Sequence, residues 1–254
     1  MDHVPTTQSE RSVLRWGGLA GMLSAVLLLV VFGIVGAFVG TDPAAPEGLV
    51  ARFPDIRAAR IVENGLYLAV IALWFIHLTA LYHTLRGHRL APALFGRALA
   101  TLGLVALAVG ALPHIATTPI SDLYHAPGAT PEQQAALVLL WQATQGMFDA
   151  LLVTGLLVLA VGLIALGLAM RETPAFGTRY GGLTIGLGVV GFASALVGLV
   201  EVSEIVAIGM FALIIFHLVI GWKTYRLSRE PRVAPQPATA IKGMSAVERA
   251  DARA

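Results

Sequence analysis

The sequence predicts an all-α polytopic membrane protein, a bundle of six transmembrane helices with both termini in the cytoplasm. Hydrophobic residues make up 57% of the 254 residues, charged residues only 13%, and the mean hydropathy is +0.78. An average soluble domain is about one-quarter charged, so a soluble fold of this composition could not cover its surface. Six apolar runs also match the roughly 20 helical residues that cross a bilayer core of about 30 Å. The third observation is the uneven placement of the basic residues.

The six predicted spans are bounded by charged residues or by loops with Pro and Gly. They cover residues 16–39, 62–85, 98–117, 149–170, 181–200 and 205–222. The first run is longer than the roughly 7 to 15 apolar residues of a signal-peptide core, so we expect it to remain as a span. The longest loops, 40–61 and 118–131, each contain three Pro. We expect His114, which follows Pro113, to close the third helix.

The basic residues predict the orientation and the domain organisation. Alternate segments, beginning with the N-terminal tail, hold two, three, two and seven Lys or Arg, whereas the other side holds only Arg52, Arg57 and Arg60. By the positive-inside rule, both tails are cytoplasmic. We therefore expect an N-terminal tail at 1–15, a transmembrane domain at 16–222 and a disordered basic tail at 223–254. The C-terminal tail should contact anionic lipid, with protein or nucleic-acid docking as the alternative.

The fourth helix is expected to be much longer than its span. Thr130 and Gln133 match a capping box around Pro131, which favours a helix over 131–170, about 60 Å long at 1.5 Å per residue. Its beginning, AALVLLWQATQGMF at 135–148, is too apolar to stand alone in water. We expect an outer cap to cover it, built from segment 44–61 as a short amphipathic helix and from segment 120–125.

A polar stripe on this helix predicts the position of a site. Gln142, Gln145 and Asp149 fall at i, i+3 and i+7, so they share one face near the outer interface. The same level should hold the other polar residues of the outer half, namely Glu63, Asn64, Tyr67, His114 and Glu201. Ionisable groups near membrane depth are costly and usually face a cavity or a partner. The hypothesis is an outward-facing polar vestibule that binds or passes a small polar or cationic ligand.

A purely structural interpretation of the same residues stays open. At the interface these groups would be hydrated, and Glu63 could pair with Arg60 on the preceding turn. Gln142 and Gln145 could hydrogen-bond between helices without any ligand.

Catalysis and cofactors receive little support from the sequence. Glu63, His114, Asp149 and Glu201 have the atom types of a divalent-metal site, but no HExxH or similar spacing supports one. His77 and His217 lie at comparable depth, so the alternative is a membrane-embedded haem or metal protein that uses them as ligands. The chain has no Cys and no nucleophile or phosphate-binding motif. We therefore predict no cofactor and no catalytic residue, and leave open whether the protein is an enzyme.

Glycine spacing predicts where helices approach each other. Gly36 and Gly40, and Gly182 and Gly186, have the small-xxx-small spacing that allows close helix contact. Besides the lipid bilayer, the partners we consider are a second copy of the chain and a larger membrane complex with this protein as accessory subunit. No nucleic-acid partner is predicted.

A family resemblance rests on residues 141–198, WQATQGMFDALLVTGLLVLAVGLIALGLAMRETPAFGTRYGGLTIGLGVVGFASALVG. A polar-striped outer half of the fourth helix is followed by a Leu-rich inner half, a short basic loop with Pro, and a Gly-rich fifth helix. This order resembles a family of uncharacterised bacterial six-helix membrane proteins known only as a domain of unknown function. The resemblance implies a multi-pass protein of the bacterial cytoplasmic (inner) membrane and carries over no activity.

Overall fold

The computed structural model of the chain describes residues 8–40, 43, 45–200 and 205–230, and regular structure in these ranges is entirely helical. The elements are α1 (Gln8–Ile34), a short π-helical continuation η1 (Val35–Val39), α2 (Pro46–Leu85), α3 (Leu90–Tyr124), α4 (Pro131–Arg171), α5 (Gly177–Val200) and α6 (Ile205–Leu227). Six helices, with η1 counted as part of the first, are long and apolar enough to cross a membrane. The predicted all-α bundle of six membrane helices is confirmed. Most of the predicted C-terminal tail, 231–254, lies outside the described residues.

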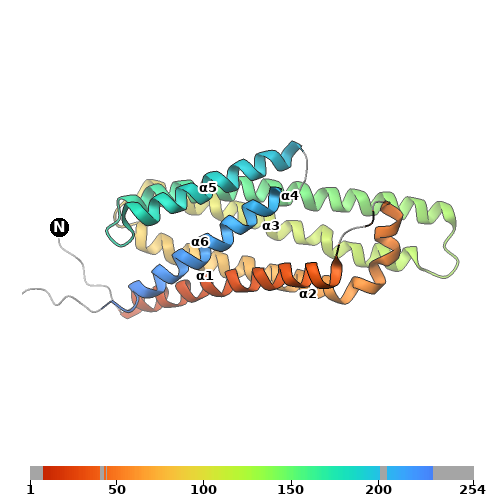
Figure 1. The fold of residues 1–254 in the computed structure, drawn as a ribbon, viewed down its shortest axis with the longest axis horizontal. Coiled ribbons are helices and arrows are strands. Elements are labelled where there is room, and N and C mark those ends of the chain that lie inside the picture. Colours follow the sequence, from red (N-terminus) through yellow and green to blue (C-terminus); the bar gives the residue numbers. More distant parts are fainter. Residues whose placement is uncertain (1–7, 41–42, 44, 201–204, 231–254) are drawn as a thin grey trace, which may run out of the picture.

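The helices form a closed ring (Figure 1). Each helix packs against the next one in the chain, and α6 packs back against α1. Short connections make consecutive helices antiparallel. The beginning of α1 and the end of α6 therefore lie at the same end of the bundle, where the Arg11 guanidinium donates a hydrogen bond to the Glu230 carbonyl at 3.2 Å.

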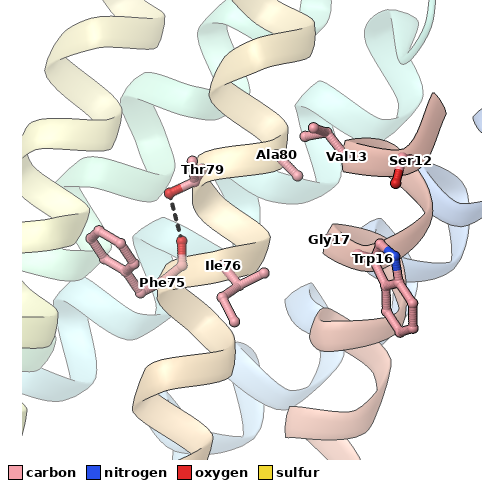
Figure 2. Close-up of a pocket in the computed structure, with 8 residues that line it drawn as sticks. All are labelled: Ser12, Val13, Trp16, Gly17, Phe75, Ile76, Thr79 and Ala80. Atoms are coloured by element: carbon pink, nitrogen blue, oxygen red, sulfur yellow. Dashed lines mark hydrogen bonds between the residues drawn. The ribbon is translucent and has the colours of Figure 1, made fainter. Parts of the chain in front are cut away.

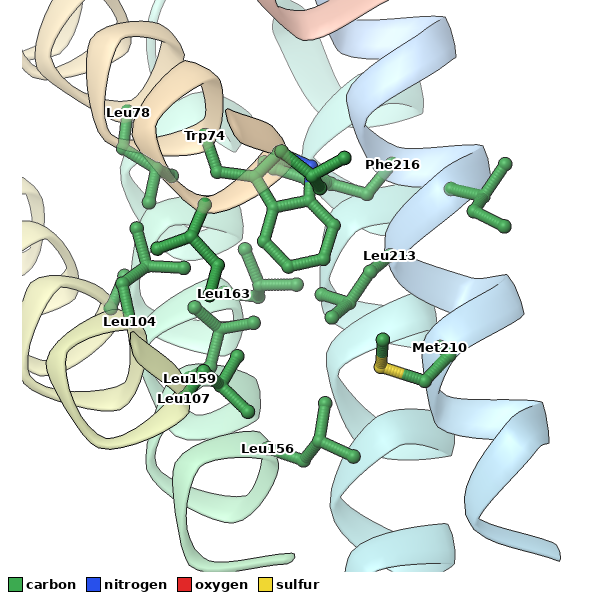
Figure 3. Close-up of a cluster of buried hydrophobic side chains, with 14 of the residues drawn as sticks. Trp74, Leu78, Leu104, Leu107, Leu156, Leu159, Leu163, Met210, Leu213 and Phe216 are labelled. Atoms are coloured by element: carbon green, nitrogen blue, oxygen red, sulfur yellow. The ribbon is translucent and has the colours of Figure 1, made fainter. Parts of the chain in front are cut away.

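The main hydrophobic core fills the centre of this ring (Figure 3). Leucines of α3 and α4 face large side chains of α2 and α6, with Trp74 and Phe216 among the largest that are fully buried. The side of the ring that faces away from the core is also apolar, with exposed residues such as Phe95, Leu112 and Leu199. A bundle that is apolar inside and outside is what a lipid environment selects.

Close helix contacts depend on other glycines than those predicted. A Cβ added to Gly103 on α3 would lie 2.6 Å from the Gly155 carbonyl oxygen on α4, and one added to Gly162 would lie 2.6 Å from the Ala100 nitrogen. The predicted pairs Gly36/Gly40 and Gly182/Gly186 are not close-approach sites, because a Cβ at any of them would meet no atom within 4 Å. The small-xxx-small spacing is present in the sequence. It does not show which face of the helix packs against a neighbouring helix.

Two predicted loops are largely helical. α2 begins at Pro46, so most of the segment 40–61 extends this helix, and α3 continues ten residues beyond His114 to Tyr124. The prediction that His114 closes the third helix is wrong. Pro54, Pro113 and Pro119 lie inside the helices, each with the loss of one backbone hydrogen bond. Membrane helices tolerate such prolines, and α2 bends near its beginning (Figure 1).

The apolar beginning of α4 is covered by the segments that the sequence indicated. Phe53 of α2 meets Trp141 of α4 edge to face, with ring centroids 5.1 Å apart. Val50, Ile120 and Val138 complete this second hydrophobic cluster. Arg57 of α2 makes an ion pair with Asp122 of α3 beside it, with two hydrogen bonds of 2.8 and 3.2 Å. Residues 46–57 thus lie across the extension of α3 and α4 (Figure 1).

Candidate functional site

The polar stripe of α4 is positioned by a helix start that the sequence specifies. The Thr130 hydroxyl accepts a hydrogen bond from the Gln133 backbone nitrogen at 3.3 Å, and the Gln133 side chain accepts one from the Thr130 nitrogen at 3.0 Å. This capping box begins α4 at Pro131, as predicted. Along the stripe, Gln142 is exposed, whereas Gln145 and Asp149 are half-buried. The stripe therefore turns inward as it approaches the main core.

Two acceptors on the stripe lack a donor. The Gln145 Oε1 atom is buried and has no hydrogen-bond partner. Asp149 makes no hydrogen bond or ion pair with any residue that the structure describes. Residues four apart on a helix lie one above the other, so both acceptors point to the same side of α4.

The α2 residues of the predicted site are already partnered in part. The Arg60 guanidinium donates to the Glu63 carboxylate at 2.9 Å, and both side chains are largely buried, with exposed fractions of 15% and 13%. The local pair that the sequence offered as an alternative for Glu63 is thus confirmed. Asn64, the next residue, and Tyr67, one turn deeper, are buried, and the Tyr67 hydroxyl donates to the Leu107 carbonyl of α3 at 3.4 Å.

His114 links α3 to α4 at the level of Asp149. Its imidazole is buried and lies 4.8 Å, centroid to centroid, from the Phe148 ring. His114 lies seven residues beyond Leu107 on α3, and Arg60 lies seven residues before Tyr67 on the antiparallel α2. At 1.5 Å per residue both are about 10 Å from the Tyr67–Leu107 contact, on the same side of it. Arg60, His114 and Asp149 therefore share one level of the bundle.

The structure thus brings several predicted site residues to one end of the bundle. Glu63, Asn64, His114 and Asp149 lie within about one turn of the same level, Tyr67 lies one turn deeper than Glu63, and Gln145 lies one turn further out. Gln142, on the exposed side, is the most distant from this level. Glu201 lies outside the described residues. Arg60 and Phe148, which the sequence analysis did not count as site residues, belong to this level through their contacts with Glu63 and His114.

Two grooves on the outside of the bundle lie elsewhere. One, about 330 Å³ in volume, runs between α1 and α2 and is lined by residues such as Trp16, Gly17 and Ile76 (Figure 2). The other, about 390 Å³, lies between α2 and α3 next to Phe75. Both are apolar and touch none of the predicted site residues.

The two histidines deeper in the bundle are adjacent. The rings of His77 on α2 and His217 on α6 lie 5.0 Å apart, centroid to centroid, with their planes at 89°. Trp74, three residues before His77, stacks on His217 at 4.8 Å. The sequence predicted that the two histidines lie at comparable depth, but no signal in it indicated that they touch. Nor did any signal indicate that Trp74 stacks on His217. Axial haem ligands lie on opposite faces of the macrocycle, and these rings leave no space for one between them.

The arrangement offers no multidentate metal site in the described ranges. No three His, Cys, Asp or Glu residues gather there as a metal would require. What the end of the bundle offers is a pair of buried or half-buried acceptors on α4, with the paired Arg60 and Glu63 and the imidazole of His114 at the same level.

Comparisons with protein-family models, with curated proteins and with solved structures give no match for this chain. The resemblance to the bacterial six-helix family therefore stays a prediction.

Proposed function

We propose that the protein binds a small cationic ligand at the end of the bundle where the first half of α2, the last third of α3 and the outer half of α4 meet. We further propose that this end faces the outside of a bacterial cytoplasmic membrane. The positions of basic residues support this orientation, since Arg52, Arg57 and Arg60 lie at this end, and the other Lys and Arg that the structure describes lie at or near the opposite end.

The observation that carries the proposal is the pair of unpartnered acceptors on α4. A buried acceptor without a donor lowers the stability of the folded state by roughly 1–3 kcal/mol, and by more if it is charged. Such acceptors are therefore rare in folded proteins. Gln145 Oε1 is in this state, and one turn along the same helix face the half-buried Asp149 carboxylate has no hydrogen-bond or ion-pair partner within the described part of the chain. A ligand that carries positive charge and N–H donors satisfies both.

The neighbouring charges favour a cation over an anion. The positive charge of Arg60 is already compensated by Glu63 at 2.9 Å. The carboxylate of Asp149 has no such counter-ion among the described residues. The local imbalance is therefore negative, which suits a small ammonium or guanidinium group that carries both positive charge and N–H donors.

Thermal unfolding of the purified full chain in detergent tests the proposal. Methylammonium, guanidinium and tetramethylammonium at millimolar concentrations are the probes, and sodium chloride at equal ionic strength is the reference. A ligand at 100 times its dissociation constant stabilises the folded state by about 2.7 kcal/mol, so at least one cation should raise the midpoint of unfolding.

The variants separate the site from general salt effects. Asp149→Asn and Gln145→Leu should abolish the rise, because they remove the acceptors. Gln142→Leu, on the exposed side of the same helix, is the matched control, and the cation should still raise its midpoint of unfolding. If no cation raises the midpoint, or if Asp149→Asn responds like the wild type, the proposal is wrong.

A further inference from the structure

The groove between α1 and α2 is apolar along its length and polar at one end. Its walls are side chains of the two helices, and its floor is the contact between Gly17 and the buried Ala80 (Figure 2). The helices are close here, because a Cβ added to Gly17 would overlap the Cβ of Ala80. On the α2 wall, the Thr79 hydroxyl is already used, since it donates to the Phe75 carbonyl at 2.8 Å. The length of the groove therefore offers the carbon surface that an alkyl chain covers.

The polar end of the groove carries hydrogen-bond donors without a partner. Ser12 and Trp16 lie one turn apart on the face of α1 that lines the groove. Neither the Ser12 hydroxyl nor the Trp16 indole N–H makes a hydrogen bond with any residue that the structure describes. Trp16 is 63% exposed, and Trp side chains gather at the membrane–water interface. This end of the groove therefore lies at the level of the lipid headgroups.

The α2 helix adds a cationic group on the same side. His83 and Arg86 follow Thr79 at i+4 and i+7, so they continue the face of α2 that lines the groove. Both side chains are exposed, and the Arg86 guanidinium makes no ion pair or hydrogen bond within the described ranges. Arg89, three residues further on, is instead paired with Glu172. Arg86 thus keeps its charge available for a partner outside the protein.

The donors of α1 and the cation of α2 lie at one level. The two helices are antiparallel and touch at Gly17 and Ala80. Ser12 comes five residues before Gly17, and Arg86 comes six residues after Ala80. At 1.5 Å per residue these positions are about 8 and 9 Å from the contact, on the same side of it. An anionic group at the end of the groove can therefore meet both helices at once.

We infer that this groove binds one anionic phospholipid, with an acyl chain between α1 and α2 and its phosphate at Ser12, Trp16 and Arg86. Guanidinium groups form strong, charge-assisted hydrogen bonds with phosphate, and the two neutral donors complete its coordination. Basic side chains at this level also attract anionic headgroups over zwitterionic ones. The apolar floor and the donors at one end therefore match the two parts of such a lipid.

The second groove, between α2 and α3, lacks these neutral donors. Among the residues that line it, only Thr101 is polar. Arg97, one turn before Thr101 on α3, lies with its guanidinium 4.8 Å from the centre of the Tyr82 ring. A chain can lie in this groove, but no free donor of α3 fixes a headgroup there. The second groove is therefore the internal control for the first.

This lipid site is independent of the proposed cation site. The two lie at opposite ends of the bundle, because α2 begins near one and ends at the other. They share no residue, and their ligands carry opposite charges. Either inference can fail without the other.

The test is quenching of tryptophan fluorescence by lipids with brominated acyl chains, with the full chain reconstituted in vesicles. Trp222→Phe is the background for every variant, because Trp222 is 46% exposed, whereas Trp74 and Trp141 are 0% and 4% exposed. Brominated phosphatidylglycerol is compared with brominated phosphatidylcholine, so the signal reports which lipid lies next to Trp16. We expect phosphatidylglycerol to be preferred about fivefold, the factor that one basic residue supplies near an anionic headgroup.

Two pairs of variants separate the site from a general attraction of anionic lipid. Arg86→Gln should abolish the preference, whereas Arg179→Gln should keep it, because Arg179 is exposed at the same end of the bundle but lines neither groove. Thr79→Phe fills the first groove and should lower the quenching by phosphatidylglycerol. Thr101→Phe fills the second groove and should leave this quenching unchanged.

The inference is overturned if the two brominated lipids quench equally in the Trp222→Phe background. It is also overturned if Arg86→Gln and Arg179→Gln reduce the preference by the same factor, since the attraction is then a property of the whole surface. A preference that survives in Trp16→Phe would place the lipid elsewhere and overturn it as well. Circular dichroism shows whether each variant is folded, and Arg86→Ala replaces Arg86→Gln if that variant is not.

Discussion

The two polar regions of the bundle differ in how their side chains are satisfied. At the end formed by α2, α3 and α4, the charged groups are in part paired, as in Arg57–Asp122 and Arg60–Glu63, and in part half-buried, as in Asp149. In the core, His77 and His217 are fully buried and contact only rings and apolar atoms. The charged groups at the end of the bundle can therefore exchange partners with solvent or a ligand. The two core histidines depend instead on the side chains packed around them.

This difference predicts that the core histidines tolerate no change in their surroundings. Gly21→Ala should lower the free energy of unfolding by about 3 kcal/mol, the upper part of the usual range for overpacking, because the new Cβ overlaps the His77 ring. Gly33→Ala on the same helix is the control, since its Cβ would meet nothing within 4 Å. Denaturation in detergent measures both. Equal stability of the two variants would show that His77 is not held against α1.

The unpartnered ring nitrogens of the core histidines predict an increase in stability when one of these histidines is replaced. His217→Phe should raise the free energy of unfolding by about 1–2 kcal/mol, because it removes buried polar atoms that have no hydrogen bond and keeps a ring beside Trp74. Thermal unfolding measures the effect. A loss of stability would mean that the imidazole makes a stabilising polar interaction in the folded protein.

The paired end predicts a smaller loss. Glu63→Gln removes the counter-ion of the largely buried Arg60 but keeps a side-chain oxygen acceptor, and it should lower the free energy of unfolding by about 1–2 kcal/mol. Arg57→Gln should lower the free energy of unfolding by less, because Arg57 and Asp122 are 43% and 56% exposed. The comparison is made by unfolding at low and high salt, and a larger effect for Arg57→Gln would contradict this order.

Asp149 should contribute least to stability. Its carboxylate has no partner among the described residues, so Asp149→Asn is expected to change the free energy of unfolding by less than about 0.5 kcal/mol, as for surface changes away from special features. A large loss of stability, measured by the same unfolding assay, would indicate a structural role for this carboxylate.

The sequence predicted the long elements well where the local signals agreed. The capping box at Thr130 and the run that follows it predicted α4 to within one residue at each end. Phe53 and Ile120, from the two segments that the sequence indicated, pack with Val138 and Trp141 at the apolar beginning of this helix. Here a cap, an apolar face and the length of the run all supported the same interpretation.

Proline and glycine signals were less informative. Pro54, Pro113 and Pro119 suggested loops, but apolar surroundings keep the backbone hydrogen-bonded, and the helices continue through them. The spacing of Gly182 and Gly186 suggested a helix contact, yet Gly103 and Gly162 make the close ones. Which face of a helix meets its neighbour depends on the rotation of the whole helix in the bundle, and the same limit prevented the sequence from showing that His77 meets His217.

The proposed cation site on α4 is tested most directly by isothermal titration of the wild type and of Asp149→Asn with guanidinium at constant ionic strength. We expect saturable binding of one guanidinium per wild-type chain and its loss in Asp149→Asn, with both proteins equally stable. Saturable binding of equal strength in both proteins, or none in the wild type, would contradict it.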